Sequence, residues 1–217
     1  MSARDTIIVA AERLFAERGI DDASLREITR AAGERNVRAL QYHFADRRGL
    51  VVAVLEFHAH QLAVQMHDRL DALEHAPDSD ARSVVECFVA PLCAIAWTPR
   101  GLCFAQIAAE VIGRARHSPS GKDDPLQVLV DDPDGAIQRW AQMIAPFMSP
   151  LVSGGPLHQR FALLRFAYVE VARQAQVAHP PRNRALFESH LTDLLTALAE
   201  AQPSGGTMAA LEDRNRA

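Results

Sequence analysis

Residues 19–50 contain the feature that most constrains the fold, two short helical patterns joined by a glycine. Ser24 precedes the first pattern and a glutamate follows it three positions later, which is the spacing of a helix capping box. Gly33 ends that helix where the following turn favours a positive φ. Asn36 can cap a further helix over residues 37–42, because its side chain can accept a hydrogen bond from the backbone there. This order predicts a helix-turn-helix, whose second helix enters the major groove of DNA.

The predicted recognition helix carries polar side chains on its outward face. Arginine can pair with guanine edges and phosphates, and glutamine can pair with adenine edges. Between residues 35 and 48 the chain has four arginines and one acidic residue, although its net charge is −4. A small basic face on an acidic protein is typical of site-specific DNA binding rather than of coating nucleic acid. The outward side chains are Arg35, Arg38, Gln41 and Tyr42.

Several short motifs in this region occur together in one known family. In chain order they are Phe15-x-x-x-Gly19, Ser24-x-x-x-Ile28 continuing to Gly33, Tyr42-His43-Phe44, and Arg47 with Leu50. Over about residues 4–60 the chain resembles the DNA-binding domain of the TetR family of transcriptional regulators. Beyond that stretch the resemblance covers only helix content and length. It implies an all-α fold, with a three-helix helix-turn-helix domain followed by a helical ligand-binding and dimerisation domain.

The resemblance also implies roles for individual residues. Ser24 would cap the second helix and contact a phosphate, and Arg47 would pair with a phosphate at the start of the fourth helix, where the family usually has lysine. Tyr42 and His43 would contact backbone phosphates, although His43 could instead fix the turn by hydrogen bonding. The residues expected near the bases are Asn36, Arg38, Ala39 and Gln41, with Arg35 beside them.

Two departures from the family pattern affect the recognition helix. Glu34 stands where the family usually has an apolar residue after the turn glycine. The segment 33–43 is also one residue longer than the commonest version. The residues that read the bases could therefore lie one position earlier or later along the recognition helix than the residues named above.

Length and composition narrow the class of protein further. The chain has 217 residues, enough for one or two domains with a substantial core. No apolar run reaches the length of a membrane span, and charged residues interrupt the N-terminal segment where a signal peptide would be apolar. We therefore expect a cytoplasmic protein that does not enter a membrane.

The cysteines do not predict a disulfide framework or a metal site. The chain has three cysteines, an odd number, at Cys87, Cys93 and Cys103. Their spacings match no zinc motif. Cys87 and Cys93 lie in an apolar helical stretch, where cysteine acts as a small hydrophobic side chain. We expect no metal and no cofactor, and a thiol sensor stays open as an alternative.

The rest of the chain predicts a helical body. Together, the head and the body are expected to contain about nine helices. We expect a DNA-binding domain over residues 1–48, a ligand-binding and dimerisation domain over 49–201, and a flexible tail over 202–217. Predicted helices cover residues 47–74, 80–97 with a kink or split at Pro91, 102–115, 135–148, 157–175 and 187–198. Residues 99–101 are expected to be a break, and residues 116–134 a loop with a short helical piece at 126–130.

The last two long helices carry apolar residues on more than one face. Their spacing of four and three resembles the seam of a coiled coil, and a helix that is apolar on two faces needs two burial partners. One partner is the chain's own core, and the other is a second copy of the chain or a larger monomer core. The predicted dimer interface is Phe161, Leu164, Tyr168, Val171, Phe187, Leu191, Leu194 and Leu198.

The middle of the chain is the candidate ligand domain, mainly because of the family resemblance. Small-molecule sites are mostly apolar with a few polar anchors, although each of these residues taken singly is better explained as ordinary core. The candidate pocket residues are Phe88, Trp97, Phe104, Trp140, Met143, Phe147, Arg165 and Tyr168.

These expectations lead to a hypothesis for the function. The leading reading is a ligand-responsive repressor that binds a palindromic double-stranded DNA operator as a homodimer and responds to a small-molecule effector. A helical adaptor without DNA binding is the alternative. A small enzyme is a third, but Glu56, His58 and His60 are too closely spaced to share one helix face, and no catalytic motif is present.

Overall fold

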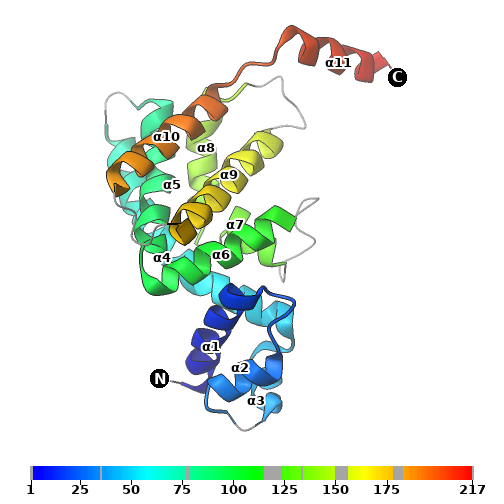
Figure 1. The fold of residues 1–217 in the computed structure, drawn as a ribbon. Helices are drawn as coiled ribbons and strands as arrows, with labels where there is room; N and C mark the ends of the chain where they lie inside the picture. The colour runs from blue at the N-terminus through cyan, green and yellow to red at the C-terminus, as the bar shows by residue number, and fades with distance from the viewer. Residues whose placement is uncertain are drawn as a thin grey trace.

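The computed structural model describes residues 2–34, 36–76, 79–114, 124–132, 134–149, 156–177 and 183–216. The described residues form eleven α-helices and one 3-10 helix, with no strand among them (Figure 1). The all-α fold class is therefore confirmed, with two helices more than expected. The helices are α1 (Ala3–Arg18), α2 (Leu25–Ala31), α3 (Val37–Phe44), α4 (Arg47–Glu74), α5 (Ala81–Ala96), α6 (Pro99–Arg114), α7 (Pro125–Val130), α8 (Ala136–Ile144), η1 (Ala145–Phe147), α9 (Pro156–Val177), α10 (Arg184–Glu200) and α11 (Gly205–Arg216).

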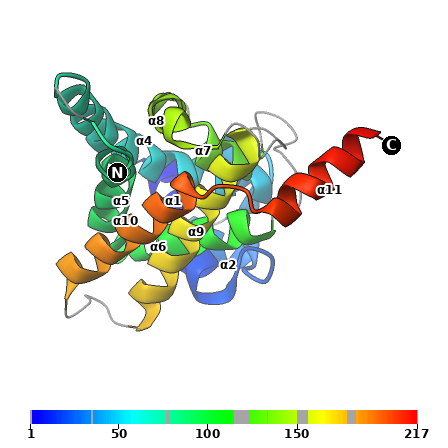
Figure 2. The ribbon, with the colours of Figure 1, turned by 90° about the horizontal axis from the view of Figure 1, so that it is seen from above.

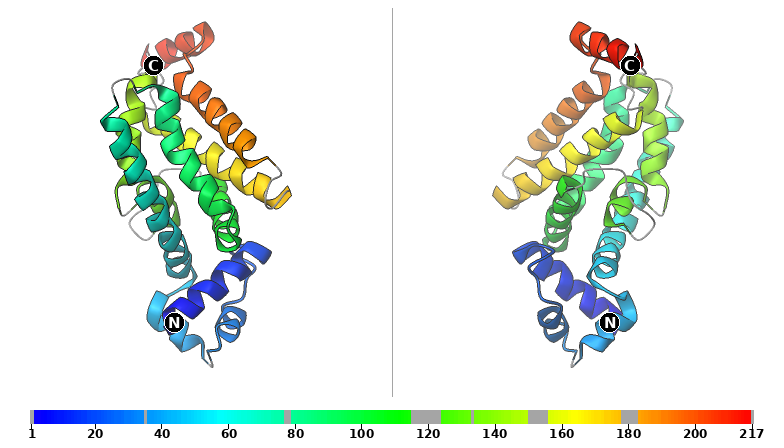
Figure 3. Two further views of the ribbon diagram at one scale, coloured as in Figure 1. Left: turned by 90° about the vertical axis from the view of Figure 1, so that its left-hand side faces the viewer. Right: turned by 90° about the vertical axis from the view of Figure 1, so that its right-hand side faces the viewer.

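The first three helices form a small head at one end of the molecule, below the larger helical body (Figure 3). Apolar side chains from each helix meet at its centre, where Ile7, Ile28 and Leu40 are completely buried. Leu50 from the start of α4 joins the same cluster. Helix α4 therefore belongs to both parts of the molecule, because its first turn completes the core of the head and its remainder enters the body.

The turns of the head follow the sequence analysis except at one cap. Gly19 and Gly33 have φ values of 90° and 77°, which explains the glycine at both positions. Ser24 occupies the N-cap position of α2, but its side chain makes no capping hydrogen bond. The predicted capping box is therefore wrong on the serine side. Its expected partner Glu27 accepts a hydrogen bond from Arg18 at 2.7 Å, because the end of α1 lies within reach of that carboxylate.

The joint between α3 and α4 depends on a very close backbone approach. Asp46 caps α4 by accepting a hydrogen bond from the N–H of Gly49 at 2.9 Å. A Cβ added at Gly49 would lie 2.1 Å from the carbonyl oxygen of Phe44. Only glycine fits there, so the sequence Asp46 to Gly49 determines how the recognition helix meets the long helix.

The body is built around a cluster of aromatic side chains. Phe88 of α5 packs against Trp140 of α8 at 5.3 Å between ring centroids and against Tyr168 of α9 at 5.7 Å. The indole N–H of Trp140 donates to the carbonyl oxygen of Val84 at 2.9 Å, so its polar atom is satisfied inside the core. Helix α9 lies against α6, and α10 lies against α5 (Figure 2).

The corner between α5 and α6 differs from the predicted break. Helix α5 runs through Pro91 from Ala81 to Ala96, and α6 begins at Pro99. Proline suits the first turn of a helix, where its missing N–H has no partner to lose. A Cβ at Gly101 would lie 1.8 Å from the carbonyl oxygen of Ile95, so glycine allows the two helices to meet closely.

The C-terminal segment was expected to be a flexible tail. In the structure it contains α11, which extends away from the body beyond the end of α10 (Figures 1 and 2). Its helical geometry was missed because Pro203, Gly205 and Gly206 suppress helix prediction, although the two glycines stand at the start of the helix.

Within the described residues, no single helix is long and apolar enough to cross a membrane. Only α5 and α6 taken together meet the criteria of length and composition, and they are bent by 120° relative to each other.

Candidate nucleic-acid interface

Helix α3 lies at the outer end of the head, far from α10 and α11 (Figure 1). The Tyr42 side chain is 86% exposed, and Arg38, Gln41 and His43 are also exposed. Leu40 points into the head with no exposed surface. The helix is therefore anchored by its inner face and leaves its outer face free for a partner.

The N-terminus of α3 is fixed as the sequence predicts. The side-chain oxygen of Asn36 accepts a hydrogen bond from the backbone N–H of Arg38 at 3.0 Å. Asn36 is exposed at this cap, so the helix N-terminus remains accessible. A helix N-terminus favours anions such as phosphate, which suits a helix that approaches DNA with this end.

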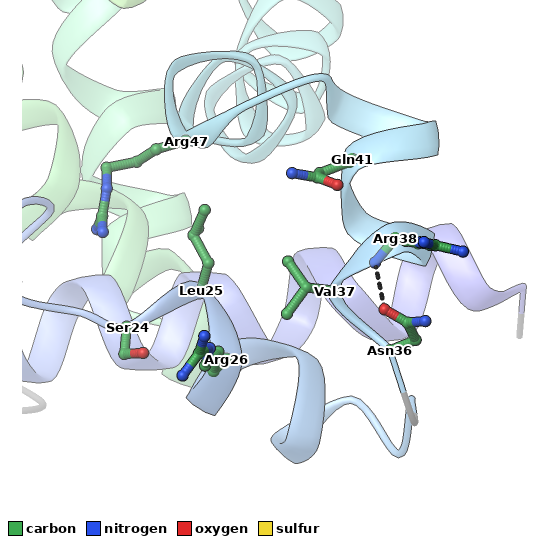
Figure 4. A pocket seen from close by; sticks show the side chains of 8 residues that line it. All are labelled: Ser24, Leu25, Arg26, Asn36, Val37, Arg38, Gln41 and Arg47. Atoms are coloured by element: carbon green, nitrogen blue, oxygen red, sulfur yellow. Dashed lines mark hydrogen bonds between the residues drawn. The ribbon is translucent and has the colours of Figure 1, made fainter.

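A hollow on the surface separates α2 from α3 (Figure 4). Val37 and Gln41 extend from α3 toward Leu25, whereas the guanidinium of Arg38 points away from the hollow. The full lining is Ser24, Leu25, Arg26, Asn36, Val37, Arg38, Gln41 and Arg47. Five of the predicted DNA-contacting residues, Ser24, Asn36, Arg38, Gln41 and Arg47, therefore lie around one surface.

Arg26 is the residue of this surface that the sequence analysis missed. It is exposed on α2 and lines the hollow opposite α3. Arg30 lies four residues later, hence on the same side of the helix, and is also exposed. This spacing of four was a usable signal, but α2 was considered only as the support of the recognition helix.

Arg47 has a different environment from the one expected. Its guanidinium donates to the carbonyl oxygens of Ile20 and of Ala23, the latter at 2.6 Å. These carbonyls belong to the connection between α1 and α2, so the side chain holds the start of α4 against that connection. The structure thus gives Arg47 a role within the head, and its phosphate contact stays a prediction.

Tyr42 and His43 lie together at the C-terminal end of α3. Their ring centroids are 5.1 Å apart in an edge-to-face arrangement. His43 also contacts the ring of Phe44, which is buried and anchors the end of the helix. Both rings are exposed, and their contacts with phosphate stay predictions. Arg35 and the side chain of Ala39 lie outside the described residues, so their roles also stay predictions.

The junction between the head and the body contains a buried ionic cluster. Glu12 of α1 is 2% exposed and accepts a hydrogen bond from Arg100 of α6 at 2.6 Å. His58 of α4 lies 3.4 Å from the same carboxylate and stacks on Phe104 at 4.9 Å. Burial alone would raise the pKa of Glu12, but the hydrogen bonds from Arg100 and the adjacent His58 outweigh burial, so the net pKa is lowered. An ionised Glu12 therefore joins three helices.

A second set of polar contacts ties the other end of α6 to the head. The backbone N–H of Ile20 donates to the Glu110 carboxylate at 3.1 Å. Arg114 pairs with Asp21 at 2.6 Å and with Glu110 at 2.7 Å. Both ends of α6 thus contact the head, one at α1 and the other at the connection between α1 and α2.

The predicted ligand pocket is largely filled by its own side chains. Phe88, Trp97, Phe104, Trp140 and Tyr168 are buried in the packed core. Met143 and Phe147 are partly buried and pack against that core. Arg165 is exposed, so the prediction of a polar anchor inside the body is wrong for this residue, because it lies on the outer side of α9.

One small cavity remains in the core beside Tyr168, between α4 and α8. Of the predicted pocket residues only Tyr168 lines it, together with Asp132 and apolar side chains of α4 and α8. The cavity has no room for a water molecule. Burial raises the pKa of Tyr168, with Asp132 adding to the effect, so the phenol stays neutral.

The predicted dimer interface is divided between the core and the surface. Leu164, Tyr168, Val171 and Leu191 are buried within the chain's own core, so the seam that they form faces inward. Phe187 packs against Trp97 at 5.7 Å between centroids. Leu194 and Leu198 are exposed as predicted. The side chain of Phe161 lies outside the described residues.

Two exposed apolar residues of α9 were missed by the choice of seam. Phe166 and Val169 are 38% and 40% exposed, and Leu194 on the neighbouring α10 is 38% exposed. A helix that is apolar on two sides has two regular stripes, and spacing alone does not show which stripe is exposed. The predicted seam followed the buried stripe of α9, whereas Phe166 and Val169 belong to the exposed stripe.

The three cysteines are free thiols. Cys87 and Cys93 are buried, and Cys103 is half-buried. Burial raises the pKa of all three thiols above the ordinary value. Since reactive cysteines have lowered pKa values, this environment favours packing over the thiol-sensor alternative.

An all-α fold with an exposed recognition helix on a three-helix head defines a helix-turn-helix DNA-binding regulator. Residues 7–54 match the family model of bacterial regulatory proteins of the tetR family. The head therefore matches this family, as its motifs predicted, and the family consists of regulators rather than enzymes. No curated protein sequence matches the chain.

Solved structures share the fold over nearly the whole chain. A bacterial regulatory protein in the tetR family from Rhodococcus RHA1 has a TM-score of 0.61 at 14% identity and covers 94% of this chain and 100% of its own. The fatty acid degradation regulator FadR from Bacillus halodurans has a TM-score of 0.55 at 12% identity, covering 92% and 99%. NalD from Pseudomonas aeruginosa, the secondary repressor of the MexAB-OprM efflux pump, has a TM-score of 0.54 at 19% identity, covering 89% and 94%.

Proposed function

We propose that this regulator is a ligand-responsive repressor that binds a palindromic operator as a homodimer. In this proposal residues 1–48 bind DNA, residues 49–201 bind the effector and the second subunit, and residues 202–217 belong to neither part. The observation that carries it is the exposed polar face of α3 at the end of the head, with Tyr42 86% exposed. Repression follows if the operator overlaps a promoter.

The proposed DNA contacts combine two kinds of side chain. Arg38 and Gln41 would contact base edges, because they project from the middle of α3 and offer guanine- and adenine-type pairing. Tyr42, His43 and Arg26 would contact phosphates at the two sides of the groove. Loss of one specific base contact costs about 1–3 kcal/mol of binding energy.

The proposed dimer uses the outer face of α9 and α10. Phe166, Val169 and Leu194 expose apolar surface on neighbouring helices, and Leu198 extends the same side of α10. Burial of apolar surface is the main favourable term in the association of two subunits. A two-fold axis through this face would direct two heads toward successive major grooves, which is the geometry of a palindromic site.

The effector is proposed to act by a shift of populations. Helix α4 passes from the head into the body, and its inner side lines the small cavity beside Tyr168. A ligand that binds better to an opened form of this cavity would favour the corresponding position of α4. Release of DNA requires that this position separates the two heads by a distance that no longer fits the operator.

The proposal is tested by selection of bound sequences from random double-stranded DNA, followed by gel-shift assays on the selected site. We expect a sequence with two-fold symmetry and half-sites one helical turn apart. Arg38→Ala and Tyr42→Ala should each weaken binding by about tenfold or more. Arg69→Ala is the matched control, because Arg69 is exposed on α4 in the body and should leave binding unchanged. Unchanged binding by both head variants would refute the placement of the recognition face.

The oligomeric state is tested separately by sedimentation. The double variant Phe166→Ser with Val169→Ser should shift the dimer toward the monomer while helicity stays the same. A wild-type monomer at micromolar concentration, or a variant that stays dimeric, would refute the proposed interface. Failure to select any DNA sequence would favour the adaptor function instead.

A further inference from the structure

A second hollow lies where the head meets the body, away from the recognition face. It has a volume of about 430 Å³ and is open to solvent. Its walls come from α1, the end of α2 and the start of α6. The apolar residues that line it are Val9, Ala10, Ala31, Ala32, Pro99 and Cys103.

The hollow exists because the facing side chains are small. Alanines stand on α1 and at the end of α2, where longer side chains would fill the space between the helices. Val9 at this site is 37% exposed and so leaves apolar surface in contact with water. The volume falls within the range of small-molecule sites, whereas the cavity in the core is closed to water. The junction therefore offers the larger ready-made space.

The charges around the hollow favour an anion. Arg13 lines it and forms no ion pair or side-chain hydrogen bond with another described residue. Arg100 also lines it, and its side chain remains 41% exposed although it pairs with Glu12. The carboxylate of Glu12 is buried and already paired with Arg100. Among the residues that line the hollow, two guanidiniums therefore stand against one paired carboxylate, although Glu17 also lies within electrostatic reach of Cys103.

We propose that this hollow binds a small amphipathic carboxylic acid and is an effector site of the regulator. The apolar body of the ligand packs on Val9 and the alanines, and its carboxylate is held by Arg13 and the exposed edge of Arg100. Carboxylates form strong charge-assisted hydrogen bonds with guanidinium groups. The inference rests on the proposed ligand response and assigns it to a different site from the core cavity.

The position of the site gives it a means of control. Arg13 belongs to the head, and Arg100 belongs to α6 of the body. A carboxylate bound by both would favour one angle between the two parts, and would compete with Glu12 for Arg100. An effector shifts an equilibrium only by its difference in affinity for the two states, and contacts that span the junction provide such a difference.

The binding site is tested on the full chain without DNA, with octanoate as the probe. Cys103 lines the hollow, whereas the other two thiols are buried. Octanoate should therefore slow the alkylation of Cys103 by iodoacetamide, measured by peptide mass spectrometry. The matched probes 1-octanol and octylammonium have the same chain without the negative charge and should protect at least tenfold more weakly.

Two variants locate the bound carboxylate and the apolar body. Arg13→Gln should weaken protection by octanoate about tenfold, the loss expected for one charge-assisted hydrogen bond. Ala31→Leu should abolish protection by filling the space, and because Ala31 is exposed the fold should tolerate leucine. Arg69→Gln in the body is the control and should protect like the wild type. Equal protection by all three probes, no protection at all, or full protection in Arg13→Gln would each overturn the site.

A gel shift with the selected operator then separates this inference from the proposed function. Octanoate should change operator affinity of the wild type and not of Ala31→Leu. Operator binding without any protection of Cys103 would refute the site and leave the DNA-binding function standing. Protection of Cys103 with no effect on a bound operator would refute the effector role of the site.

Discussion

The core of the body and the junction with the head are held together by different kinds of contact. In the body, Phe88, Trp140 and Tyr168 pack as buried rings around one hydrogen-bonded indole. At the junction, Glu12 and Arg100 make a buried ionic contact, and the ends of α6 add further ion pairs to the head.

This difference indicates which part of the molecule can move. Apolar packing is short-ranged and close-fitting, so the body resists a change in the relative position of its helices. Polar contacts at the junction can be exchanged for contacts with water, an ion or a ligand. This exchange costs less free energy than breaking the apolar packing of the body. The replaceable contacts of the described residues are therefore concentrated at the junction with the head.

The largest expected effect is on the core of the body. Trp140→Ala would remove a side chain that is 1% exposed and leave a cavity beside Phe88. We expect the free energy of unfolding to fall by about 3–5 kcal/mol, as for other large-to-small changes in cores. Urea denaturation followed by circular dichroism measures it. Trp140→Phe should lose much less, and equal losses in the two variants would argue against close packing at this position.

A smaller effect is expected for the buried contact of the junction. Glu12→Gln would keep the shape of the side chain and remove the charge that faces Arg100 and His58. We expect a loss of about 1–2 kcal/mol in urea denaturation, because the half-exposed Arg100 can regain water. If Glu12→Gln lowered the free energy of unfolding as much as Trp140→Ala does, the junction would not be held more weakly than the core of the body.

The pH dependence of that loss provides a sharper test. Because the pKa of Glu12 is lowered in the folded protein, its ionised form stabilises the fold above the ordinary value of 4.5 and loses this effect as the pH falls through the lowered pKa. The stability difference between the wild type and Glu12→Gln should therefore shrink as the pH falls below 4.5. A difference that stays undiminished well below that pH would contradict a titrating, stabilising Glu12 carboxylate.

The smallest effect is expected at the exposed end of α6. Arg114 and Asp21 are 56% and 71% exposed, so solvent screens their pair. Arg114→Gln should change the free energy of unfolding by about 0–1 kcal/mol, and 0.5 M salt should remove the change. A larger loss that persists in salt would show that this end of the junction is held as firmly as Glu12.

The head was the part best predicted from sequence, because its signals are local. Gly33 and Asn36 act on the residues beside them, and the structure has each at the predicted turn or cap. Helix α4 was predicted with its observed bounds, since the apolar spacing starts at a cap and continues without interruption. The Ser24 side chain makes no capping hydrogen bond, whereas Glu27 pairs with Arg18, a contact between helices that the local pattern does not show.

The body shows the limit of periodicity. The apolar spacing placed α9 and α10 correctly along the chain. It did not show which of the two apolar faces of α9 packs into the core. Leu164 and Val171 are buried, whereas Phe166 and Val169 are exposed. Arg165 was predicted as a buried anchor, and the same uncertainty of rotation placed it on the wrong side.

The sequence by itself determined the elements of this protein, namely the helices, the glycine turns and the family of the head, because these depend on neighbours along the chain. Only the tertiary structure decided which residues meet across the junction. Glu12, His58 and Arg100 are far apart in sequence, and no spacing rule connects them. The exposed hollow beside Arg13 has the same origin, since it depends on how α1, α2 and α6 fail to fill the space between them. One short segment of sequence thus predicts the helix-turn-helix, whereas the contacts that position it come from the packing of helices.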